Sequence, residues 1–188
     1  MDMVLQVDIS GTPQNWLSPL EAATLFCGGN VAWSLPSLVA VLHGGTQKSG
    51  LRSILEIPAI LATRGMAKIN LLEIEPHLTK HNDKLFARDR HLCAYCGNIF
   101  TEAHLTREHV TPLSQNGRDH WNNVVSACSP CNGIKANRTP EQARMPLLYF
   151  PYTPNRYEDF LLRRAGKKIL ADQMDFLLSK VQSGSRLL

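Results

Sequence analysis

Short apolar runs dominate the first third of the chain and predict β-strands. Residues 3–9 alternate between apolar and polar positions with a period near two, which is typical of a strand with one buried face. Three later runs are rich in β-branched and apolar residues and are separated by glycine and proline, so they are predicted as strands of a small sheet: residues 31–35, 38–43 and 54–63. The pattern therefore predicts a sheet-forming N-terminal segment.

One helix is predicted to interrupt these strands. Ser18 is the predicted N-cap, Pro19 takes the first helical position, and Glu21 lies three residues after the cap, which is the pattern of a capping box. Cys27, at the end of this apolar run, is expected to be a small buried side chain without chemistry. Between the first strand and this helix, the chain is predicted to be broken by Gly11, Pro13 and Asn15.

Towards the C-terminus the apolar spacing changes to that of an α-helix. Residues 159–182 predict two helices divided near Gly166, and residues 139–145 predict a capped helical turn. Residues 147–157 contain two prolines and are expected to form an extended strap, while residues 183–188 are expected to fray. Residues 67–76 fit a strand or a short helix equally well.

These elements predict an α+β protein with three parts. A small α+β domain is expected at residues 1–78, a compact metal-stapled module at 79–150 and a helical extension at 151–188. The hydrophobic content of 44% and charged content of 19% are typical of globular domains. No apolar run approaches the roughly 20 residues of a membrane-spanning helix, and an acid near the N-terminus is unlike a signal peptide, so a cytoplasmic protein without a membrane partner is expected.

The charge is unevenly distributed. Residues 1–80 carry five Lys and Arg against six Asp and Glu, whereas residues 81–188 carry 15 against 10. A basic excess confined to the second part of the chain is expected if that part faces a polyanion, although many solvated helices carry such an excess too.

Four of the five cysteines form two Cys-x-x-Cys pairs, Cys93 with Cys96 and Cys128 with Cys131. Two such turns supply the four thiolates of a tetrahedral zinc site, which is a better explanation than a redox motif because no thioredoxin-like sequence surrounds them. Residues 97–127 separate the pairs, and this is longer than the roughly 15 to 20 residues of a simple zinc ribbon. The insertion is therefore expected to hold structure of its own.

Within this insertion, the order strand, loop, strand and helix is predicted to assemble a second site. The first strand ends near Val110, the second covers residues 122–128, and a helix begins within residues 131–137. This order brings Glu108 and His109 beside Asn132 of the helix. An acidic ligand for a hard cation, an imidazole that takes a proton from water and a polar partner are what a hydrolytic site requires.

The motifs CAYCG, LTREHVTPLS, WNNVVSAC and CNGIKANRTP resemble those of HNH endonucleases of the ββα-metal type, in the class braced by a four-cysteine zinc knuckle. The resemblance covers about residues 85–150. It implies that Glu108 and Asn132 bind the catalytic metal, that His109 is the general base and that Asn123 orients it. Phosphate contacts are implied for three basic residues, Arg107, Lys135 and Arg138.

Two departures from the family pattern bear on the metal. The acidic position is commonly aspartate, whereas Glu108 is one methylene longer, and Asn132 stands where histidine is frequent. Oxygen donors at both positions suit magnesium or manganese. His104 and His120 are near enough in sequence to be alternatives to the base, and Trp121 is expected to be a core anchor.

The resemblance implies a metal-dependent endonuclease, a nickase or double-strand cutter of bacterial or phage type, that leaves 5′-phosphate and 3′-hydroxyl ends on DNA. Two alternatives remain: a zinc-stapled nucleic-acid-binding protein that has lost activity, and a nuclease acting on RNA. Double-strand cleavage by one site per chain would favour a homodimer.

Overall fold

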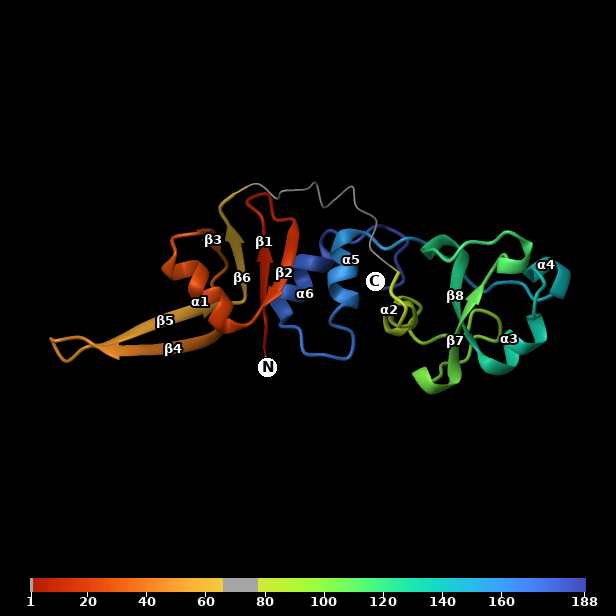
Figure 1. The fold of residues 1–188 in the computed structure, drawn as a ribbon, viewed down its shortest axis with the longest axis horizontal. Coiled ribbons are helices and arrows are strands. Elements are labelled where there is room, and N and C mark those ends of the chain that lie inside the picture. The colour runs from red at the N-terminus through yellow and green to blue at the C-terminus, as the bar shows by residue number, and fades with distance from the viewer. Residues whose placement is uncertain (1, 66–77) are drawn as a thin grey trace. The chain divides into compact units, whose positions relative to one another are not determined.

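The computed structural model describes residues 2–65 and 78–188 and confirms a mixed fold of small sheets and short helices (Figure 1). The described residues form two compact units, 2–65 with 166–180 and 78–165 with 181–188. The segment 67–76, which fitted either a strand or a helix, lies outside the described residues. Within the described ranges, no helix has the length and apolar character needed to cross a membrane.

The first unit is built on a four-stranded sheet in the order β2-β1-β6-β3. Its strands are β1 (Val4–Val7), β2 (Pro13–Leu17), β3 (Val31–Ser34) and β6 (Ile60–Thr63). β1 pairs parallel with β6 and antiparallel with β2, and β3 is antiparallel to β6. The prediction that the chain is broken between Gly11 and Asn15 was wrong for β2, because a proline is tolerated as the first residue of a strand at a sheet edge.

Helix α1 (Pro19–Cys27) packs on this sheet and begins with the predicted capping box. The Ser18 hydroxyl accepts a hydrogen bond from the Glu21 amide at 3.3 Å, and the Glu21 carboxylate accepts one from the Ser18 amide at 2.7 Å. The helix ends before Gly28. Cys27 is exposed in its last turn, so the prediction that this thiol is buried was wrong.

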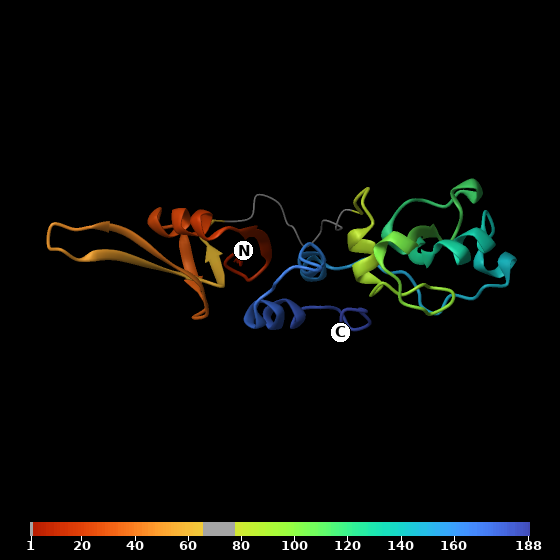
Figure 2. The same ribbon diagram turned by 90° about the horizontal axis from the view of Figure 1, so that it is seen from below.

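Strands β4 (Leu38–Thr46) and β5 (Arg52–Pro58) form a separate two-stranded antiparallel sheet. The predicted single strand over residues 54–63 is therefore two strands, β5 and β6, interrupted at Ala59. The inner end of this hairpin packs on the core through Leu42 and Leu55, whereas residues 43–54 are exposed. In both views the hairpin extends away from the sheet of its own unit as an arm (Figures 1 and 2).

Helix α6 (Ala171–Leu178) completes the first unit although it comes from the far end of the chain. The buried Gln173 amide donates hydrogen bonds to the backbone carbonyls of Met3 at 2.7 Å and Ala59 at 2.8 Å. Leu177 of the same helix is fully buried. The beginnings of the two central strands, β1 and β6, are thus tied to a residue more than a hundred positions away.

The second unit contains a ββα arrangement of β7 (Leu105–His109), β8 (Val124–Cys128) and α3 (Ser129–Lys135). The two strands pair antiparallel, with His109 opposite Val124. Three further helices surround them, α2 (Asp83–Arg88), α4 (Pro140–Ala143) and α5 (Arg156–Leu162), and short 3₁₀ turns precede and follow β7 and precede β8. Trp121 is 1% exposed in the core of this unit, which confirms its predicted role as an anchor.

A buried ion pair braces β8 from the side of α2. Arg88 and Asp89 are both fully buried, and the Arg88 guanidinium donates to the backbone carbonyls of Trp121 and Val124 at 3.0 and 2.8 Å. The Asp89 carboxylate accepts a hydrogen bond from the Ser126 amide at 2.7 Å. Each charge is compensated by its partner and by backbone groups, which is the condition under which buried ions are tolerated.

The C-terminal residues pack on the second unit rather than fraying as predicted. The hydroxyls of Ser185 and Tyr152 lie 3.2 Å apart, and the Arg186 guanidinium sits 3.6 Å from the centre of the Tyr149 ring. A cation over an aromatic face is a favourable contact, which explains why this polar tail is ordered.

Candidate functional site

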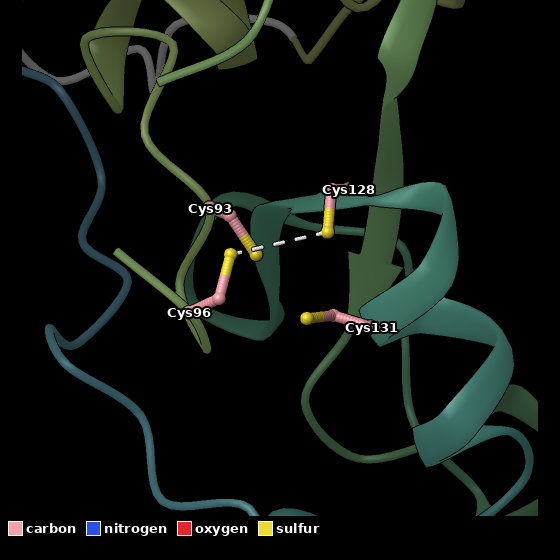
Figure 3. Close-up of side chains that lie close together, drawn as sticks. All are labelled: Cys93, Cys96, Cys128 and Cys131. Carbon is pink, nitrogen blue, oxygen red and sulfur yellow. Dashed lines mark hydrogen bonds between the residues drawn. The ribbon is translucent and has the colours of Figure 1, made fainter. Parts of the chain in front are cut away.

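The four cysteines of the two Cys-x-x-Cys pairs converge on one point (Figure 3). Their sulfur atoms lie within 4.8 Å of one another, and the Cys96 and Cys128 sulfurs are 4.0 Å apart. Cys93 and Cys96 lie on a turn closed by the bridge between Leu92 and Ile99, whereas Cys128 ends β8 and Cys131 lies in the first turn of α3. The cluster could hold a metal such as zinc, because four converging sulfurs are the ligand set of a structural site.

The backbone around the cluster favours a thiolate at Cys93. Burial opposes ionisation of this thiol, but hydrogen bonds from backbone amides, including those of Cys96 and Cys128, outweigh burial and lower the pKa of Cys93 to about 7. Burial raises the pKa of Cys131, and the neighbouring cysteines raise it further. A group of thiols that resist joint ionisation in the absence of a cation is expected at a metal site, since the metal supplies the missing positive charge.

A second site is a polar pocket of about 250 Å³ at the end of β7. Glu108 and His109 reach it from the last two positions of the strand, and Asn132 reaches it from α3. The antiparallel pairing of β7 with β8 and the turn from β8 into α3 bring the helix back beside the strand end. The three residues that the sequence predicted to converge therefore line one pocket.

Glu108 is only 5% exposed and forms an ion pair with Lys135. The Lys135 ammonium donates to Glu108 Oε1 at 2.5 Å and to the backbone carbonyl of His109 at 2.8 Å. Burial raises the pKa of the Glu108 carboxyl, and the hydrogen bond and charge of Lys135 offset this in part. Lys135, expected at a nucleic-acid phosphate, is instead fully buried beneath the pocket.

Asn132 is held by the neighbouring strand. Its amide nitrogen donates to the Thr106 hydroxyl at 2.8 Å, which fixes the side chain where it lines the pocket. The side-chain carbonyl is thereby distinguished from the nitrogen and can serve as an oxygen donor. Arg138, beyond the helix, is exposed, and its guanidinium donates to the backbone carbonyls of Lys135 and Ile134.

The His109 imidazole is positioned by a residue that the sequence did not single out. His109 Nε2 lies 3.0 Å from Asp119 Oδ1, and Arg107 Nη1 donates to the other oxygen of Asp119 at 2.7 Å. Arg107 is anchored in turn by Asn82 Oδ1 at 3.0 Å and the Thr79 carbonyl at 2.5 Å. No spacing motif links Asp119 to His109, because the loop that joins them returns on itself.

Asn123 holds this loop closed. Its side-chain oxygen accepts a hydrogen bond from the Thr111 amide, and its nitrogen donates to the carbonyls of Thr111 and Arg118, each at 2.9 Å. The side chain therefore links the two ends of the loop between β7 and β8, and its amide groups are used on the backbone of that loop. The alternative histidines lie elsewhere: His120 is exposed in the loop, and His104 bonds the Thr101 hydroxyl at 2.9 Å.

Comparison with known proteins finds a match within this region. The model of the HNH endonuclease family matches residues 93–148, which span both cysteine pairs and the pocket. No curated protein matches the chain. With the ββα arrangement and the clustered cysteines already described, the match identifies residues 93–148 as a domain of the HNH endonuclease family.

Proposed function

We propose that this protein is a metal-dependent endonuclease that hydrolyses phosphodiester bonds of DNA and leaves 5′-phosphate and 3′-hydroxyl ends. The observation that carries the proposal is the pocket at the end of β7, where a carboxylate, an imidazole and an amide meet in a domain matched by the HNH endonuclease family. These are the groups needed for a cation site and a general base.

The donor set of the pocket fits a hard divalent cation. Glu108 offers a carboxylate whose Oε1 is held by Lys135, so Oε2 is the oxygen assigned to the metal, and Asn132 offers its side-chain carbonyl. Oxygen donors of this kind suit magnesium or manganese better than zinc, for which sulfur and imidazole are the usual ligands. When bound, the cation would stabilise charge on the scissile phosphate and on the leaving 3′ oxygen.

Zinc is the metal assigned to the four-cysteine cluster. The cluster has four ligands and leaves no position for a substrate, which is the arrangement of a structural site rather than a catalytic one. Its ligands join the turn at Cys93 and Cys96 to the junction of β8 and α3, so zinc would fix α3, and with it Asn132, against the strands.

The chain itself supplies the base. His109, with 19% of its side chain exposed, lies at the pocket and can take a proton from a water molecule there. The water oxygen then forms a bond to phosphorus while the bond to the 3′ oxygen breaks, and the leaving oxygen takes a proton from solvent. Among the three basic residues expected at phosphates, Arg138 is the exposed one, whereas Arg107 and Lys135 are engaged with carboxylates, so Arg138 is assigned to a backbone phosphate.

Cleavage of supercoiled plasmid with magnesium or manganese tests the proposal. Activity should be lost in His109→Ala and retained in His104→Ala, a matched change at an exposed histidine outside the pocket. Nicked circles would indicate single-strand cutting, and linear products together with dimers in sedimentation would support a homodimer. Undiminished cleavage in His109→Ala would refute the assignment of the base.

Labelled single-stranded and duplex DNA and RNA of the same sequence define the substrate. Cleavage of RNA alone would overturn the assignment to DNA. Binding of DNA without cleavage in the presence of any metal would support the alternative of a catalytically silent binding protein. One observation favours this alternative: the Lys135 ammonium competes with a metal cation for the Glu108 carboxylate.

A further inference from the structure

The loop between β7 and β8 brings three side chains into a row beside the pocket. Asp119 lies between Arg107 and His109 and accepts a hydrogen bond from each through a different carboxylate oxygen. The exposed fraction of the side chain is 13% for Arg107, 19% for His109 and 49% for Asp119. The carboxylate is thus reachable by water, while both of its partners are held by the fold.

Resting on the proposed function, we infer that Asp119 is the positioning residue for His109. Its carboxylate keeps the neutral imidazole in the tautomer with the proton on Nε2 and leaves Nδ1 as the nitrogen that takes the proton from water. In a neutral imidazole one nitrogen donates and the other accepts, and the hydrogen bond at one nitrogen sets the state of the other. A carboxylate can only accept, so it selects the Nε2–H form.

The position of Asp119 is set by the loop and not by its neighbours in sequence. Asn123 links the backbone of Thr111 to that of Arg118, the residue before Asp119. The backbone carbonyl of Asn123 also accepts a hydrogen bond from the Val110 amide at 2.9 Å, next to His109. Asn123 therefore acts on the imidazole indirectly, because it holds together the two chain segments that carry the base and its partner.

Arg107 determines how a side chain at position 119 would be oriented towards His109, and this allows a test by substitution. An asparagine at position 119 would present one oxygen and one NH₂ group to its two neighbours. The Arg107 guanidinium has only donors, so it would take the amide oxygen and turn the NH₂ group towards His109. His109 Nε2 would then have to accept, and the proton would move to Nδ1, the nitrogen needed for the base.

The experiment measures the tautomer directly in the full-length, zinc-loaded protein. Ring nitrogens of ¹⁵N-histidine-labelled protein are recorded by long-range ¹⁵N–¹H spectra at a pH where the imidazole is neutral, and His109→Gln identifies the signal of His109 among the seven histidines. The proton is expected on Nε2 in the wild type and on Nδ1 in Asp119→Asn. This result does not depend on whether the protein cuts nucleic acid.

Cleavage kinetics provide the functional arm of the same test. In Asp119→Asn, kcat should fall about tenfold to a hundredfold with little change in KM, since partners that orient a reacting imidazole or a metal ligand typically contribute effects of that size or larger. Asp119→Glu restores a carboxylate and should recover part of the lost kcat. Glu102→Gln is the matched control: Glu102 faces His91 at 3.6 Å on the same unit, away from the pocket, and its loss should leave kcat unchanged.

Two results would overturn the inference: a His109 ring that keeps its proton on Nε2 in Asp119→Asn, or a raised KM with unchanged kcat, which would mean that Asp119 serves substrate binding through Arg107. If the wild type cuts nothing but the tautomer still switches, the pair is real and the proposed function is what fails.

Discussion

Gly117 is the residue on which closure of the loop between β7 and β8 depends. A Cβ atom built at this position would lie 1.8 Å from the backbone oxygen of Thr111, closer than any real side-chain carbon approaches an oxygen. The Gly117 amide donates to the Pro112 carbonyl at 3.0 Å, which fixes the tight return of the chain. Only glycine, which has no Cβ atom, allows the backbone at position 117 to lie this close to the Thr111 carbonyl. Gly117 is therefore required by the backbone conformation and not by the chemistry of the site.

Gly117→Ala should therefore open the loop and separate Asp119 from His109. We expect a loss of about 1–3 kcal/mol in the free energy of unfolding, as for other overpacked sites, together with a loss of cleavage. Chemical denaturation and plasmid cleavage measure the two effects. Gly133→Ala is the control: its Cβ would meet nothing within 4 Å, and an alanine inside α3 should stabilise by about 0.5–1 kcal/mol. Equal stability of the two variants would contradict the prediction.

Glu108 should make metal binding sensitive to acid. Burial raises the pKa of its carboxyl, so the ionised form that binds a cation is lost at a higher pH than for an exposed glutamate. The free energy of unfolding depends on pH in the opposite direction from metal binding. The contribution of this group is fully present below the usual glutamate pKa and decreases as the pH rises through the raised folded-state value.

Manganese affinity can be measured by calorimetry between about pH 4 and pH 8. As the pH is lowered, the affinity is expected to begin to fall at a pH above the usual glutamate pKa of about 4.3. Glu108→Gln should abolish this dependence together with the affinity. An affinity that stays constant down to the usual glutamate pKa would count against the assigned ligand.

At the scale of elements, the junction of β8 and α3 carries both sites. Cys128 ends the strand, Cys131 lies in the first turn of the helix, and the next residue, Asn132, lines the pocket. α3 has only seven residues, too few to be stable alone in water. Its position must come from the sulfur cluster and from its packing on the two strands.

Cys128→Ser should consequently abolish zinc binding and disorder α3, since structural zinc contributes on the order of 10 kcal/mol to the folding of small modules. Zinc content and amide protection of residues 124–135 would show this. Cys27→Ser supplies the control, because this exposed cysteine lies outside the cluster. Unchanged zinc content in Cys128→Ser would show that the cluster does not bind zinc.

Elements that depend on residues close together in the sequence could be predicted from it. Elements whose conformation depends on contacts with distant residues could not. The capping boxes at Ser18 and Thr139 were predicted because cap and partner lie three residues apart. β2 was missed because its pairing with β1 outweighs its poor strand composition. In the site, Glu108, His109 and Asn132 were predicted through strand and helix order, whereas Asp119 depends on how a loop closes.

At the scale of the whole molecule, each unit has a hydrophobic core of its own. Val4, Ile57 and Leu61 belong to the core of the first unit, and Leu85, Leu105 and Val124 to that of the second. The helical period predicted α5 and α6 as neighbours in sequence, but periodicity holds no information on the unit that each joins. In the structure α5 belongs to the second unit and α6 to the first.

Removal of zinc by a chelator should therefore unfold the second unit and leave the first folded, because the cysteine cluster belongs only to the second. Hydrogen exchange followed by mass spectrometry should show lost protection in residues 105–109 and 124–135 and retained protection in residues 4–7 and 60–63. Simultaneous loss of protection in both sets would mean that the two cores fold as one.

The position of α6 in the sequence, after all the strands of its sheet, also determines when that sheet can be completed during translation. A ribosome releases β1 and β6 long before it reaches Gln173, whose amide bonds the backbone of Met3 and Ala59. β1 and β6 therefore remain incompletely covered until helix α6, residues 171–178, has been translated. A nascent chain stalled before residue 171 would expose this sheet to chaperones, although its nuclease segment had already been synthesised.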